Sequence, residues 1–271
     1  MANMTSSVSA SQVAGELASA TFEEIPALVE HYREDPRQQV IKACERALKR
    51  HAKELSERER VNGMYELMHE LGGDGVVVGV DEVGRGSVAG PLTVCAVCLP
   101  MEPRIWGIND SKKLTPARRE LLSVKIAEVA TAIGFCHIAP ADIDEMGMAR
   151  AIRAAVAGAV ADTGLEPDCV LMDGNPLGAV PHERDVVKGD AKIACIAAAS
   201  IMAKVTRDEM MVEYDAEYPE YHLAESKGYA SPEHIEAIRK HGLSPLHRVS
   251  FCGNFLQTER HFLGQLWRQG P

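Results

Sequence analysis

No apolar stretch in the sequence approaches the roughly 20 residues that a membrane-spanning helix needs. The first residues also lack a basic segment followed by an apolar one, which is the pattern of a secretory signal peptide. We therefore expect a cytoplasmic protein without a membrane partner. The net charge of −10 means that a generally basic nucleic-acid coat is absent as well. A nucleic-acid enzyme is still compatible with this charge if a local basic patch and metal ions offset an acidic centre.

The seven cysteines show no disulfide pattern, because their number is odd and most of them lie in apolar runs. This predicts buried free thiols in a reducing compartment. Cys95 and Cys98 form a C-x-x-C spacing, but no second pair accompanies them. Residues three apart on a strand point to opposite faces, so a shared zinc site is not expected there.

The length of 271 residues suits one large domain or a core domain with an appendage. Residues 1–20 are rich in serine and alanine and poor in bulky apolar residues, which predicts disorder. Residues 21–72 are expected to form a helical extension, whose apolar stripe has spacings of three and four and comprises Ile41, Cys44, Leu48, His51 and Leu55. Residues 73–256 are expected to form the main domain, and residues 257–271 a C-terminal tail.

The same extension is rich in basic residues, namely Lys42, Arg46, Lys49, Arg50 and Lys53. The ordinary interpretation is a solvated face on a helix that packs against the core. The alternative is an additional contact with nucleic acid.

From Val76 onward the sequence alternates between strand and helix patterns. β-Branched and apolar runs predict strands over residues 76–81, 92–99, 132–138, 169–172 and 185–187. Thr115-Pro116 and Ser231-Pro232 each combine an N-cap residue with proline at the first helical position, so helices are expected to begin there. Further helices are expected over residues 143–161 and 191–214. This alternation predicts an α/β fold with helices packed on a central sheet.

Four carboxylates stand directly after predicted strands. Asp81 and Glu82 follow the first strand, Asp173 follows the fourth, and Asp190 lies between the last strand and a helix. Active sites of open α/β sheets gather at strand ends, and four acids placed together would repel one another unless divalent cations joined them. Oxygen ligands favour Mg²⁺ or Mn²⁺, and two such ions about 4 Å apart suit in-line hydrolysis of a phosphodiester. A single acid after a strand is an ordinary turn or cap residue, so the prediction depends on all four.

Two segments near these acids are candidate substrate contacts. Gly84-Arg85-Gly86 forms a loop that a ligand can approach closely. Lys112 precedes a predicted helix, where basic residues oppose the helix dipole and are explained more easily by a phosphate. A simple exposed loop is the alternative for Lys112.

The predicted helix after Asp190 and the loop that follows it carry further candidates. Steps of 100° per residue place Ala197 and Lys204 near the helical face of Asp190. Arg207 extends a polar stripe on this otherwise apolar helix. Tyr229 lies on a loop, where it either stacks on a sugar or base or serves as a packing residue.

Taken together, these segments closely resemble bacterial type 2 ribonuclease H, the ribonuclease HII family. The resemblance covers about residues 73–256, and the matching motifs occur in the family's order: Gly79–Gly86, Asp110–Leu114, Met172–Asn175, Lys188–Asp190 with Ala197–Asp208, Lys227–Tyr229 with Pro232–His234, and His247–Phe251. The agreement of separate motifs in one order makes the resemblance highly specific.

The resemblance implies a ribonuclease H-like fold, with a mixed central sheet, flanking helices and a C-terminal helical part. It implies an endonuclease that hydrolyses the RNA strand of RNA–DNA hybrids. It also implies cutting 5′ of single ribonucleotides in duplex DNA, which leaves 3′-hydroxyl and 5′-phosphate ends. The expected partners are therefore RNA–DNA hybrids and ribonucleotide-containing duplexes, and we expect a monomer.

The resemblance also implies roles for individual residues. The family's catalytic residues, which would hold two Mg²⁺ or Mn²⁺ ions, correspond to Asp81, Glu82, Asp173 and Asp190. The backbone groups that would read the 2′-hydroxyl correspond to Gly84, Arg85 and Gly86. The residue that would stack on the neighbouring deoxyribose corresponds to Tyr229. Candidates for phosphate or active-site contacts are Lys112, Lys204 and Arg207.

The arginine at position 85 favours ribonuclease HII over the similar ribonuclease HIII, which usually has a lysine there. The N-terminal domain of ribonuclease HIII is strand-rich and resembles the TATA-binding protein. Residues 21–71 are predicted to be helical instead, and they lie outside the minimal ribonuclease HII pattern. In the C-terminal tail, Gln265-Leu266-Trp267 faintly suggests a sliding-clamp peptide, for which a turn of helix is the simpler alternative.

Three other functions fit part of the sequence. A metal-dependent phosphatase or nuclease with another substrate would share the four acids but would not require the Gly-Arg-Gly loop or Tyr229. A dinucleotide-binding module would need a third glycine at position 89, which is alanine here, and a helix where a strand is predicted. A hybrid-binding protein without catalytic activity would not need all four acids.

Overall fold

The computed structural model describes residues 8–256 and contains two compact units. The boundary lies between Asn62 and Gly63, inside the long helix α3 (Gln38–Gly72). Sequence analysis places the start of the main domain after this helix, at residue 73, but the last part of α3 belongs to the second unit. There the fully buried Tyr65 accepts a hydrogen bond at its hydroxyl from the Ile105 backbone N–H, at 3.1 Å.

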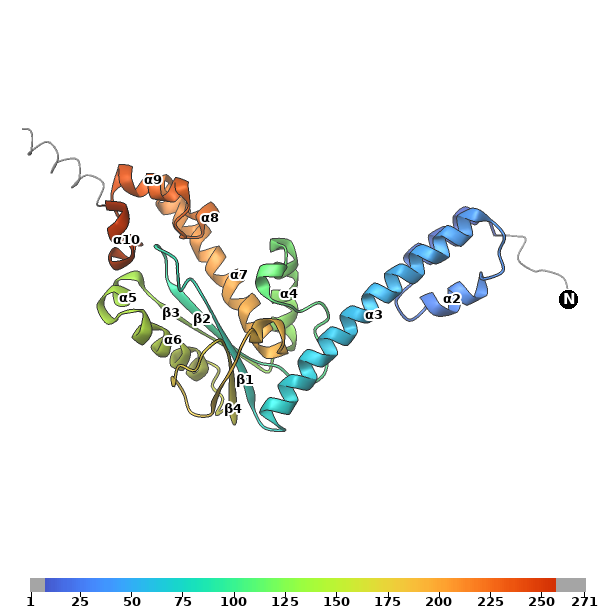
Figure 1. The fold of residues 1–271 in the computed structure, drawn as a ribbon, viewed down its shortest axis with the longest axis horizontal. Helices are drawn as coiled ribbons and strands as arrows, with labels where there is room; N and C mark the ends of the chain where they lie inside the picture. Colours follow the sequence, from blue (N-terminus) through green and yellow to red (C-terminus); the bar gives the residue numbers. More distant parts are fainter. Residues whose placement is uncertain (1–7, 257–271) are drawn as a thin grey trace, which may run out of the picture. The chain divides into compact units, whose positions relative to one another are not determined.

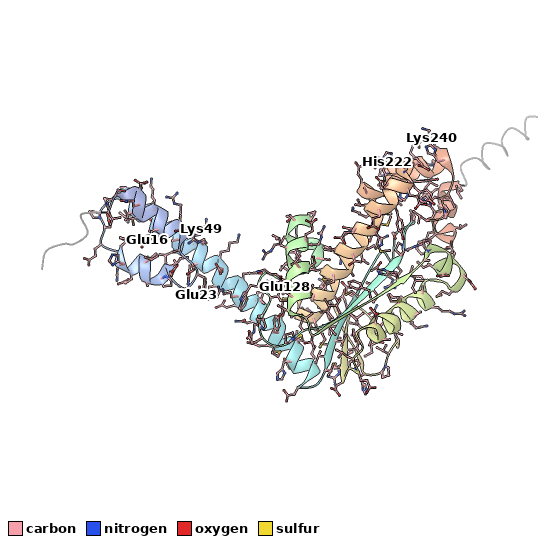
Figure 2. The ribbon with its side chains drawn as sticks, turned by 180° about the vertical axis from the view of Figure 1, so that it is seen from behind. Glu16, Glu23, Lys49, Glu128, His222 and Lys240 are labelled. Atoms are coloured by element: carbon pink, nitrogen blue, oxygen red, sulfur yellow. The ribbon has the colours of Figure 1, made fainter. Side chains whose placement is uncertain are left out.

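The N-terminal unit is built from α1 (Ala10–Ser19), α2 (Ile25–His31) and the first part of α3 (Figure 1). Polar contacts surround its small core (Figure 2): Glu16 accepts from the Tyr32 hydroxyl at 2.8 Å, and Glu23 pairs with Arg58 at 3.0 Å. The core consists of Val13, Leu17, Ile25, Val40, Ala43 and Ala47. The described part of this unit is therefore built from helices.

Residues 10–19 form a helix where sequence analysis predicts disorder. Ser9 and Gln12 build a capping box at the start of α1, in which each side chain accepts a hydrogen bond from the other residue's backbone N–H. Val13 and Leu17 lie about one turn apart and are buried in the core that α1 shares with α3. The prediction was wrong because it weighed the few apolar residues of this segment without the surface that they pack against.

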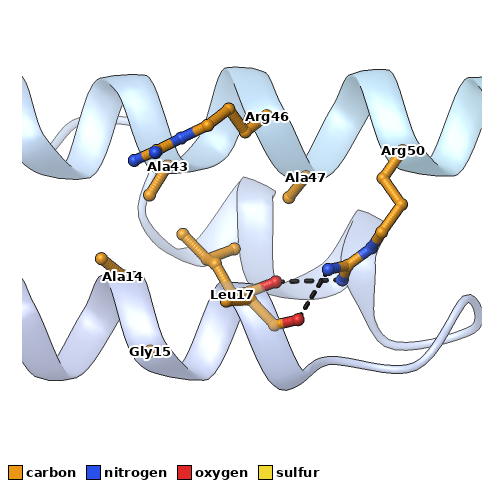
Figure 3. A pocket seen from close by; sticks show the side chains of 8 residues that line it. Ala14, Gly15, Leu17, Ala43, Arg46, Ala47 and Arg50 are labelled. Carbon is orange, nitrogen blue, oxygen red and sulfur yellow. Dashed lines mark hydrogen bonds between the residues drawn. The ribbon is translucent and has the colours of Figure 1, made fainter.

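Three of the five residues in the apolar stripe predicted for α3 do not face the core. Ile41, Leu48 and Leu55 are 36%, 46% and 43% exposed, whereas Ala43 and Ala47 are buried. In Figure 3, Leu17 of α1 and the two alanines of α3 line the space between the helices, and Arg50 reaches across to α1. Its guanidinium donates to the carbonyl oxygens of Leu17, Ala18 and Ala20. The helix turns small residues inward because they allow close packing, so its bulkier side chains remain at the surface.

The second unit contains a five-stranded mixed sheet in the order β3-β2-β1-β4-β5. Its strands are β1 (Val77–Val83), β2 (Leu92–Cys98), β3 (Ala132–Ile138), β4 (Cys169–Asp173) and β5 (Glu183–Val186). β2 pairs antiparallel with both β1 and β3, while β1, β4 and β5 run parallel. This sheet confirms the predicted fold class. The carboxyl ends of its three parallel strands meet at one edge.

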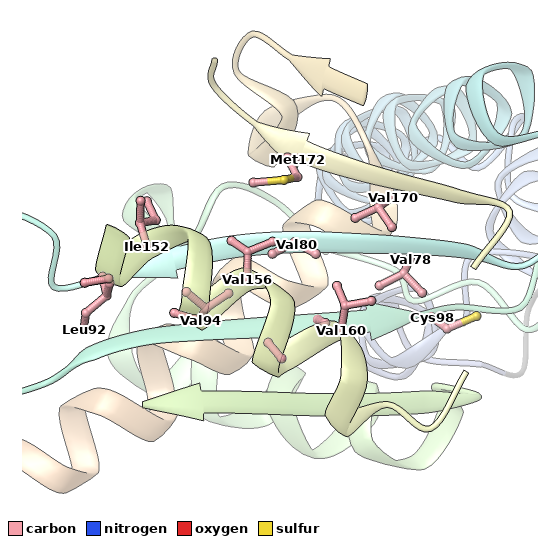
Figure 4. Packing of buried hydrophobic residues seen from close by; sticks show 14 of the residues in the cluster. Val78, Val80, Leu92, Val94, Cys98, Ile152, Val156, Val160, Val170 and Met172 are labelled. Atoms are coloured by element: carbon pink, nitrogen blue, oxygen red, sulfur yellow. The ribbon is translucent and has the colours of Figure 1, made fainter. Parts of the chain in front are cut away.

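One face of the sheet is covered by α6 (Met148–Asp162), which follows α5 (Pro140–Met146) (Figure 4). Val78 and Val80 of β1 pack there against Ile152 and Val156 of α6. Sequence analysis predicts a single helix over residues 143–161. Two helices form instead, because Gly147 adopts a left-handed backbone with φ of 80° between them.

The other face is covered by α7 (Ala194–Glu217), with α4 (Pro116–Val129) packed beside it. Gly79 of β1 is essential for this packing, since a Cβ atom there would lie 2.3 Å from the carbonyl carbon of Cys195. A short 3₁₀ turn, η2 (Gly189–Ala191), precedes α7. Asp190 therefore lies outside the helix, and the argument that placed Ala197 and Lys204 on its helical face does not apply.

The described chain ends in a helical part made of η3 (Pro219–Tyr221), α8 (Leu223–Ser226), α9 (Pro232–His241) and α10 (Val249–Leu256). Its core includes Tyr221 and Ile238, together with Val88 from the loop after β1 and Met211 of α7. An isolated β-bridge joins Ala89 of that loop to His247. The predicted C-terminal tail, residues 257–271 with Gln265-Leu266-Trp267, lies outside the described residues.

All seven cysteines are free, and Cys95, Cys98, Cys169, Cys195 and Cys252 are buried. This agrees with the free thiols expected from the sequence. Between residues 8 and 256, no helix is long and apolar enough to cross a membrane.

Candidate active site

The sheet places the four predicted carboxylates at one edge. Val80 of β1 pairs with Met172 of the parallel strand β4, so Asp81 and Asp173 follow at neighbouring positions. Glu82 comes next on β1, and Asp190 lies in η2, directly after β5. Because alternate residues of a strand point to opposite faces, Asp81 points toward α7, as Gly79 does.

The four acids act on one another electrostatically. Asp81 is only 8% exposed, and burial together with the neighbouring charges of Glu82 and Asp173 raises its pKa to about 8. Burial also raises the pKa of Glu82, and the charge of Asp173 adds to that effect. The pKa of Asp190 is raised for the same two reasons. The charged form of this cluster is therefore unfavourable without a cation.

Backbone and hydroxyl donors orient two of these acids. The Oδ1 atom of Asp81 accepts a hydrogen bond from the Glu82 N–H at 2.8 Å, and its carboxyl group also faces the Ser200 hydroxyl on α7. The Oδ1 atom of Asp173 accepts from the Gly189 N–H at 2.7 Å, which ties the end of β4 to η2 and to Asp190. The chain thus orients the carboxylates of Asp81 and Asp173 through its own hydrogen bonds.

The residues present fit a divalent cation of the Mg²⁺ or Mn²⁺ type, because all four side chains supply oxygen ligands. Arg85 lies 3.5 Å from Glu82 and Lys112 lies 3.5 Å from Asp190, but Asp81 has no ion pair within residues 8–256. In the same range, no three His, Cys, Asp or Glu side chains converge into a ready-made ligand shell. The buried, mutually repelling carboxylates are the observation that favours a cation.

Lys112 reaches the acids because its turn is held against α7. It belongs to η1 (Ser111–Lys113), where the Ser111 and Ser200 hydroxyls are hydrogen-bonded at 2.9 Å. Arg119 of α4 donates to the carbonyl oxygens of Ser111 and Leu114, at 2.9 Å and 2.7 Å. Sequence analysis gave no role to Ser111; a short polar side chain opposite a buried serine is visible only once the sheet and helix are assembled.

The Gly-Arg-Gly loop is joined to the loop that carries Tyr229. The backbone N–H groups of Val88 and Ala89 both donate to the Gly228 carbonyl oxygen, at 2.8 Å and 3.1 Å. Gly84 has φ of 84°, and a Cβ atom on it would lie 2.3 Å from Arg207 Nε. Only glycine meets both conditions at position 84 without strain.

Arg207 is not available as a substrate contact, which corrects the sequence prediction. It has no exposed surface, and its guanidinium donates to four oxygen atoms, those of Ser87 Oγ and of the carbonyl groups of Ala89, Pro91 and Lys227. Burial lowers its pKa. Arg207 therefore fastens the loop after β1 to the segment before Tyr229.

Arg248 supports the same loop from the other side and has no role in the sequence analysis. It is fully buried and donates to the carbonyl oxygen of Gly90 at 2.9 Å and to that of Arg85 at 3.2 Å. Burial and the charge of Arg207 lower its pKa to about 10. The sequence motif around His247 contains Arg248, but nothing local indicates that its acceptors lie near position 90.

Tyr229 keeps its ring at the surface, with 40% of the residue exposed. The ring lies 5.8 Å from the Arg207 guanidinium carbon, and the Tyr229 carbonyl oxygen bonds to His234 Nδ1 at 2.8 Å. The backbone of Tyr229 is therefore fixed while its ring is free to meet a ligand.

Lys204 does not join the acids. Its ammonium group lies 2.7 Å from Asp208 Oδ1, and it lines a surface groove together with Arg119 and Lys227. Within the described residues, no hydrogen bond or ion pair connects Lys204 with the four carboxylates. Arg85 and Lys112, by contrast, are both brought to the acids.

Sequence comparison relates both units to known proteins. The family model described as Ribonuclease HII matches residues 78–254, and the model described as Ribonuclease HII N-terminal domain matches residues 9–71. The helical extension, which sequence analysis set outside the minimal family pattern, thus has a family model of its own. The chain is 42% identical over 225 residues to the ribonuclease HII of Geobacillus thermodenitrificans, covering 82% of this chain and 87% of that protein.

Structural comparison gives the same relationship. The ribonuclease H2 of Pyrococcus horikoshii OT3 superposes with a TM-score of 0.56 at 26% identity, covering 72% of this chain and 99% of that one. Bst-RNase HIII in complex with Mn²⁺ gives a TM-score of 0.55 at 19% identity, covering 72% of this chain and 71% of that one. At this identity, the second likeness speaks for the fold alone.

Proposed function

The chain belongs to the ribonuclease HII family, and on that premise we propose that it cuts duplex DNA 5′ of single embedded ribonucleotides. The family consists of metal-dependent endonucleases that act on the RNA strand of RNA–DNA hybrids. The finer activity, with 3′-hydroxyl and 5′-phosphate products, is the proposal. A monomer is its proposed active form, with hybrids and ribonucleotide-containing duplexes as substrates.

One observation carries this proposal: the edge with four carboxylates lies beside a loop that is bonded to the Tyr229 segment. An enzyme that cuts at a ribonucleotide needs a hydrolytic centre and a sugar reader in a fixed relationship. The hydrogen bonds from Val88 and Ala89 to Gly228, and those of Arg207 to both loops, supply such a connection. A general phosphatase would not require it.

We propose that Asp81, Glu82, Asp173 and Asp190 hold two Mg²⁺ or Mn²⁺ ions. When bound, such a pair of ions activates a water molecule and stabilises the leaving 3′ oxygen. The chain's own groups prepare the site: Ser200 and the Glu82 N–H orient Asp81, and the Gly189 N–H orients Asp173. Lys112, largely exposed beside Asp190, is placed to attract a phosphate.

We further propose that the backbone of Gly84, Arg85 and Gly86 reads the 2′-hydroxyl, the group that distinguishes RNA from DNA. The Tyr229 ring stacks on the adjacent deoxyribose. Arg207 and Arg248 act as positioning residues, since they hold the reading loop through its carbonyl oxygens and leave its outer surface open.

The proposal is tested with duplex DNA that carries one ribonucleotide, incubated with Mg²⁺ or Mn²⁺ beside an all-DNA duplex. We expect one cut directly 5′ of the ribonucleotide and none in the control. Cleavage restricted to hybrids with several ribonucleotides would contradict the proposed junction specificity. Cleavage of both duplexes would contradict the assignment of a 2′-hydroxyl reader and favour a general nuclease.

A further inference from the structure

The first part of α3 carries four basic side chains on one face: Lys42, Arg46, Lys49 and Lys53. At 100° and 1.5 Å per residue, their directions stay within about 60° of one another over a length of about 16 Å. All four are exposed, and Figure 2 labels Lys49 among them. We refer to these four residues as the basic stripe.

The other arginines of the N-terminal unit are already engaged. Arg37 lies 2.5 Å from Asp35, Arg58 lies 2.9 Å from Glu54, and Arg50 donates to three carbonyl oxygens around the end of α1. No member of the basic stripe forms an ion pair with any carboxylate in residues 8–256. Arg46 makes one hydrogen bond, from Nε to the Lys42 carbonyl oxygen at 3.1 Å, which leaves its charge unpaired. The unit thus contains cations that hold it together and, in the basic stripe, cations that form no ion pair within the described residues.

The charge around the basic stripe is opposite to that of the whole protein. Residues 42–53 contain five basic side chains and a single acid, Glu45, in a chain of net charge −10. Glu45 lies about 60° from the direction of Lys42 on the helix, and it forms no ion pair among the described residues. The core residues Ala43 and Ala47 lie about 90° and 130° from the middle of the stripe, and one of its four members, Arg46, also lines the space between α1 and α3.

We propose that the basic stripe binds the phosphate backbone of a nucleic-acid duplex. This inference rests on the proposed function, because it assigns the N-terminal unit a grip on the same substrate. Phosphates of one strand are spaced by about 3.4 Å along a duplex, so 16 Å of helix covers about five of them. Side chains of this kind recognise charge and not sequence, so hybrid and DNA duplexes bind alike.

The arrangement suits a duplex better than a lipid surface. A helix that lies on a membrane buries apolar side chains between its flanking cations. The exposed apolar residues of α3, Ile41, Leu48 and Leu55, point roughly 120° away from the basic stripe. A duplex needs only the cations.

The test uses the full chain in EDTA, so that the duplex is bound but not cut. Fluorescence anisotropy measures the affinity for an RNA–DNA hybrid and for a DNA duplex between 50 and 300 mM salt. The variant Lys42→Gln, Arg46→Gln, Lys49→Gln, Lys53→Gln is expected to bind both about tenfold or more weakly. Its slope of log affinity against log salt should fall by about 2 to 4, since each phosphate contact contributes about 0.9. An unchanged slope overturns the proposal.

Matched controls separate a local contact from a general charge effect. The charge-preserving variant Lys42→Arg, Arg46→Lys, Lys49→Arg, Lys53→Arg should bind as the wild type does. The pair Lys49→Gln, Lys53→Gln removes as much charge as Arg150→Gln, Lys240→Gln, two exposed residues on α6 and α9. The first pair should lower the slope by about 1 to 2 and the second should leave it unchanged. Equal effects of the two pairs overturn the proposal.

Two further measurements complete the test. Vesicles of anionic phosphatidylglycerol should not discriminate between wild type and the fourfold glutamine variant; a loss of vesicle binding without a loss of duplex binding overturns the proposal. Under Mg²⁺ and saturating substrate, the fourfold glutamine variant should keep the wild-type kcat. A wild type that binds with the full slope but cuts no ribonucleotide contradicts the proposed function and leaves the basic stripe supported.

Discussion

The Nε2 atoms of His234 and His247 lie 3.1 Å apart in the C-terminal helical part. The other ring nitrogens assign their tautomers, because His234 Nδ1 donates to the Tyr229 carbonyl oxygen while His247 Nδ1 accepts from the Ser244 N–H. His247 then donates from Nε2 to His234. A chain of hydrogen bonds therefore runs from Ser244 to Tyr229, and it is intact only when both imidazoles are neutral.

This pair predicts a loss of stability in weak acid. Burial lowers the pKa of His234, and burial together with His234 lowers the pKa of His247 to about 4. As the pH falls, these histidines are protonated in the unfolded chain before they are protonated in the folded protein. The stability that the neutral pair contributes is therefore present above about pH 6.5 and is lost as the pH falls toward 4. Thermal unfolding should show the wild type more stable than His247→Gln by roughly 5 °C at pH 7.5, with the gap closing by pH 4.5. A gap that is independent of pH would contradict the neutral pair.

Removal of the Asp81 charge is expected to stabilise the metal-free protein and to lower its activity. Its pKa is raised to about 8, mainly by burial, so the metal-free protein loses stability as the pH rises from about 4 to 8. Asp81→Asn keeps the Oδ1 acceptor but removes the charge. In EDTA it should melt several degrees above wild type at pH 8 and close to it at pH 4, while hybrid cleavage with Mg²⁺ falls at least about 100-fold. A melting temperature at or below that of wild type at pH 8 would show that the charged form of Asp81 does not destabilise the metal-free protein.

Substitution of Arg207 is expected to weaken substrate specificity without damaging the hydrolytic centre. Lysine at this position cannot reproduce the fork that reaches Ser87, Ala89, Pro91 and Lys227. Arg207→Lys should reduce the preference for a ribonucleotide over a deoxyribonucleotide about tenfold in kcat/KM. The matched control is Arg153→Lys, which changes an exposed arginine that donates to the Leu177 carbonyl oxygen at 2.9 Å. If both variants lowered kcat/KM on all substrates equally, Arg207 would have only a general structural role.

The strands and helix starts of the second unit could be predicted because their causes are local. β3 was predicted at its observed bounds, Ala132–Ile138, and α9 was predicted to begin at its observed first residue, Pro232, since apolar runs and Ser-Pro caps act over a few residues. The acids were expected to meet because they stand at strand ends, where the active sites of open α/β sheets gather. The roles of Arg207 and Arg248 could not be predicted, because most of their acceptors lie more than one hundred positions away along the chain.

The inward face of α3 shows a different limit of prediction from the sequence. Ile41, Leu48 and Leu55 satisfy helical periodicity as well as Ala43 and Ala47 do, so periodicity leaves two faces in competition. The choice depends on α1, whose Leu17 needs a shallow surface to pack on. Likewise Lys204 looked like a site residue on a helical wheel, but Asp190 lies in η2, outside α7, and Lys204 pairs with Asp208 instead.

The ring and the backbone of Tyr229 have different expected roles, the ring in substrate recognition and the backbone in holding the loop. Its ring is exposed and contributes no hydrogen bond within the described residues, while its carbonyl oxygen holds the loop through His234. Tyr229→Ala should therefore melt within about 2 °C of wild type but cut a single-ribonucleotide duplex at least about tenfold more slowly, whereas Tyr229→Phe should retain most of the rate, because stacking needs only the ring. Longer RNA–DNA hybrids offer several registers, so their cleavage should fall less. The test is to measure the cleavage rates of both variants on both substrates. An equal loss of rate on the two substrates would mean that Tyr229 supports the hydrolytic centre. An equal loss for the phenylalanine and alanine variants would mean that its hydroxyl, not its ring, meets the substrate.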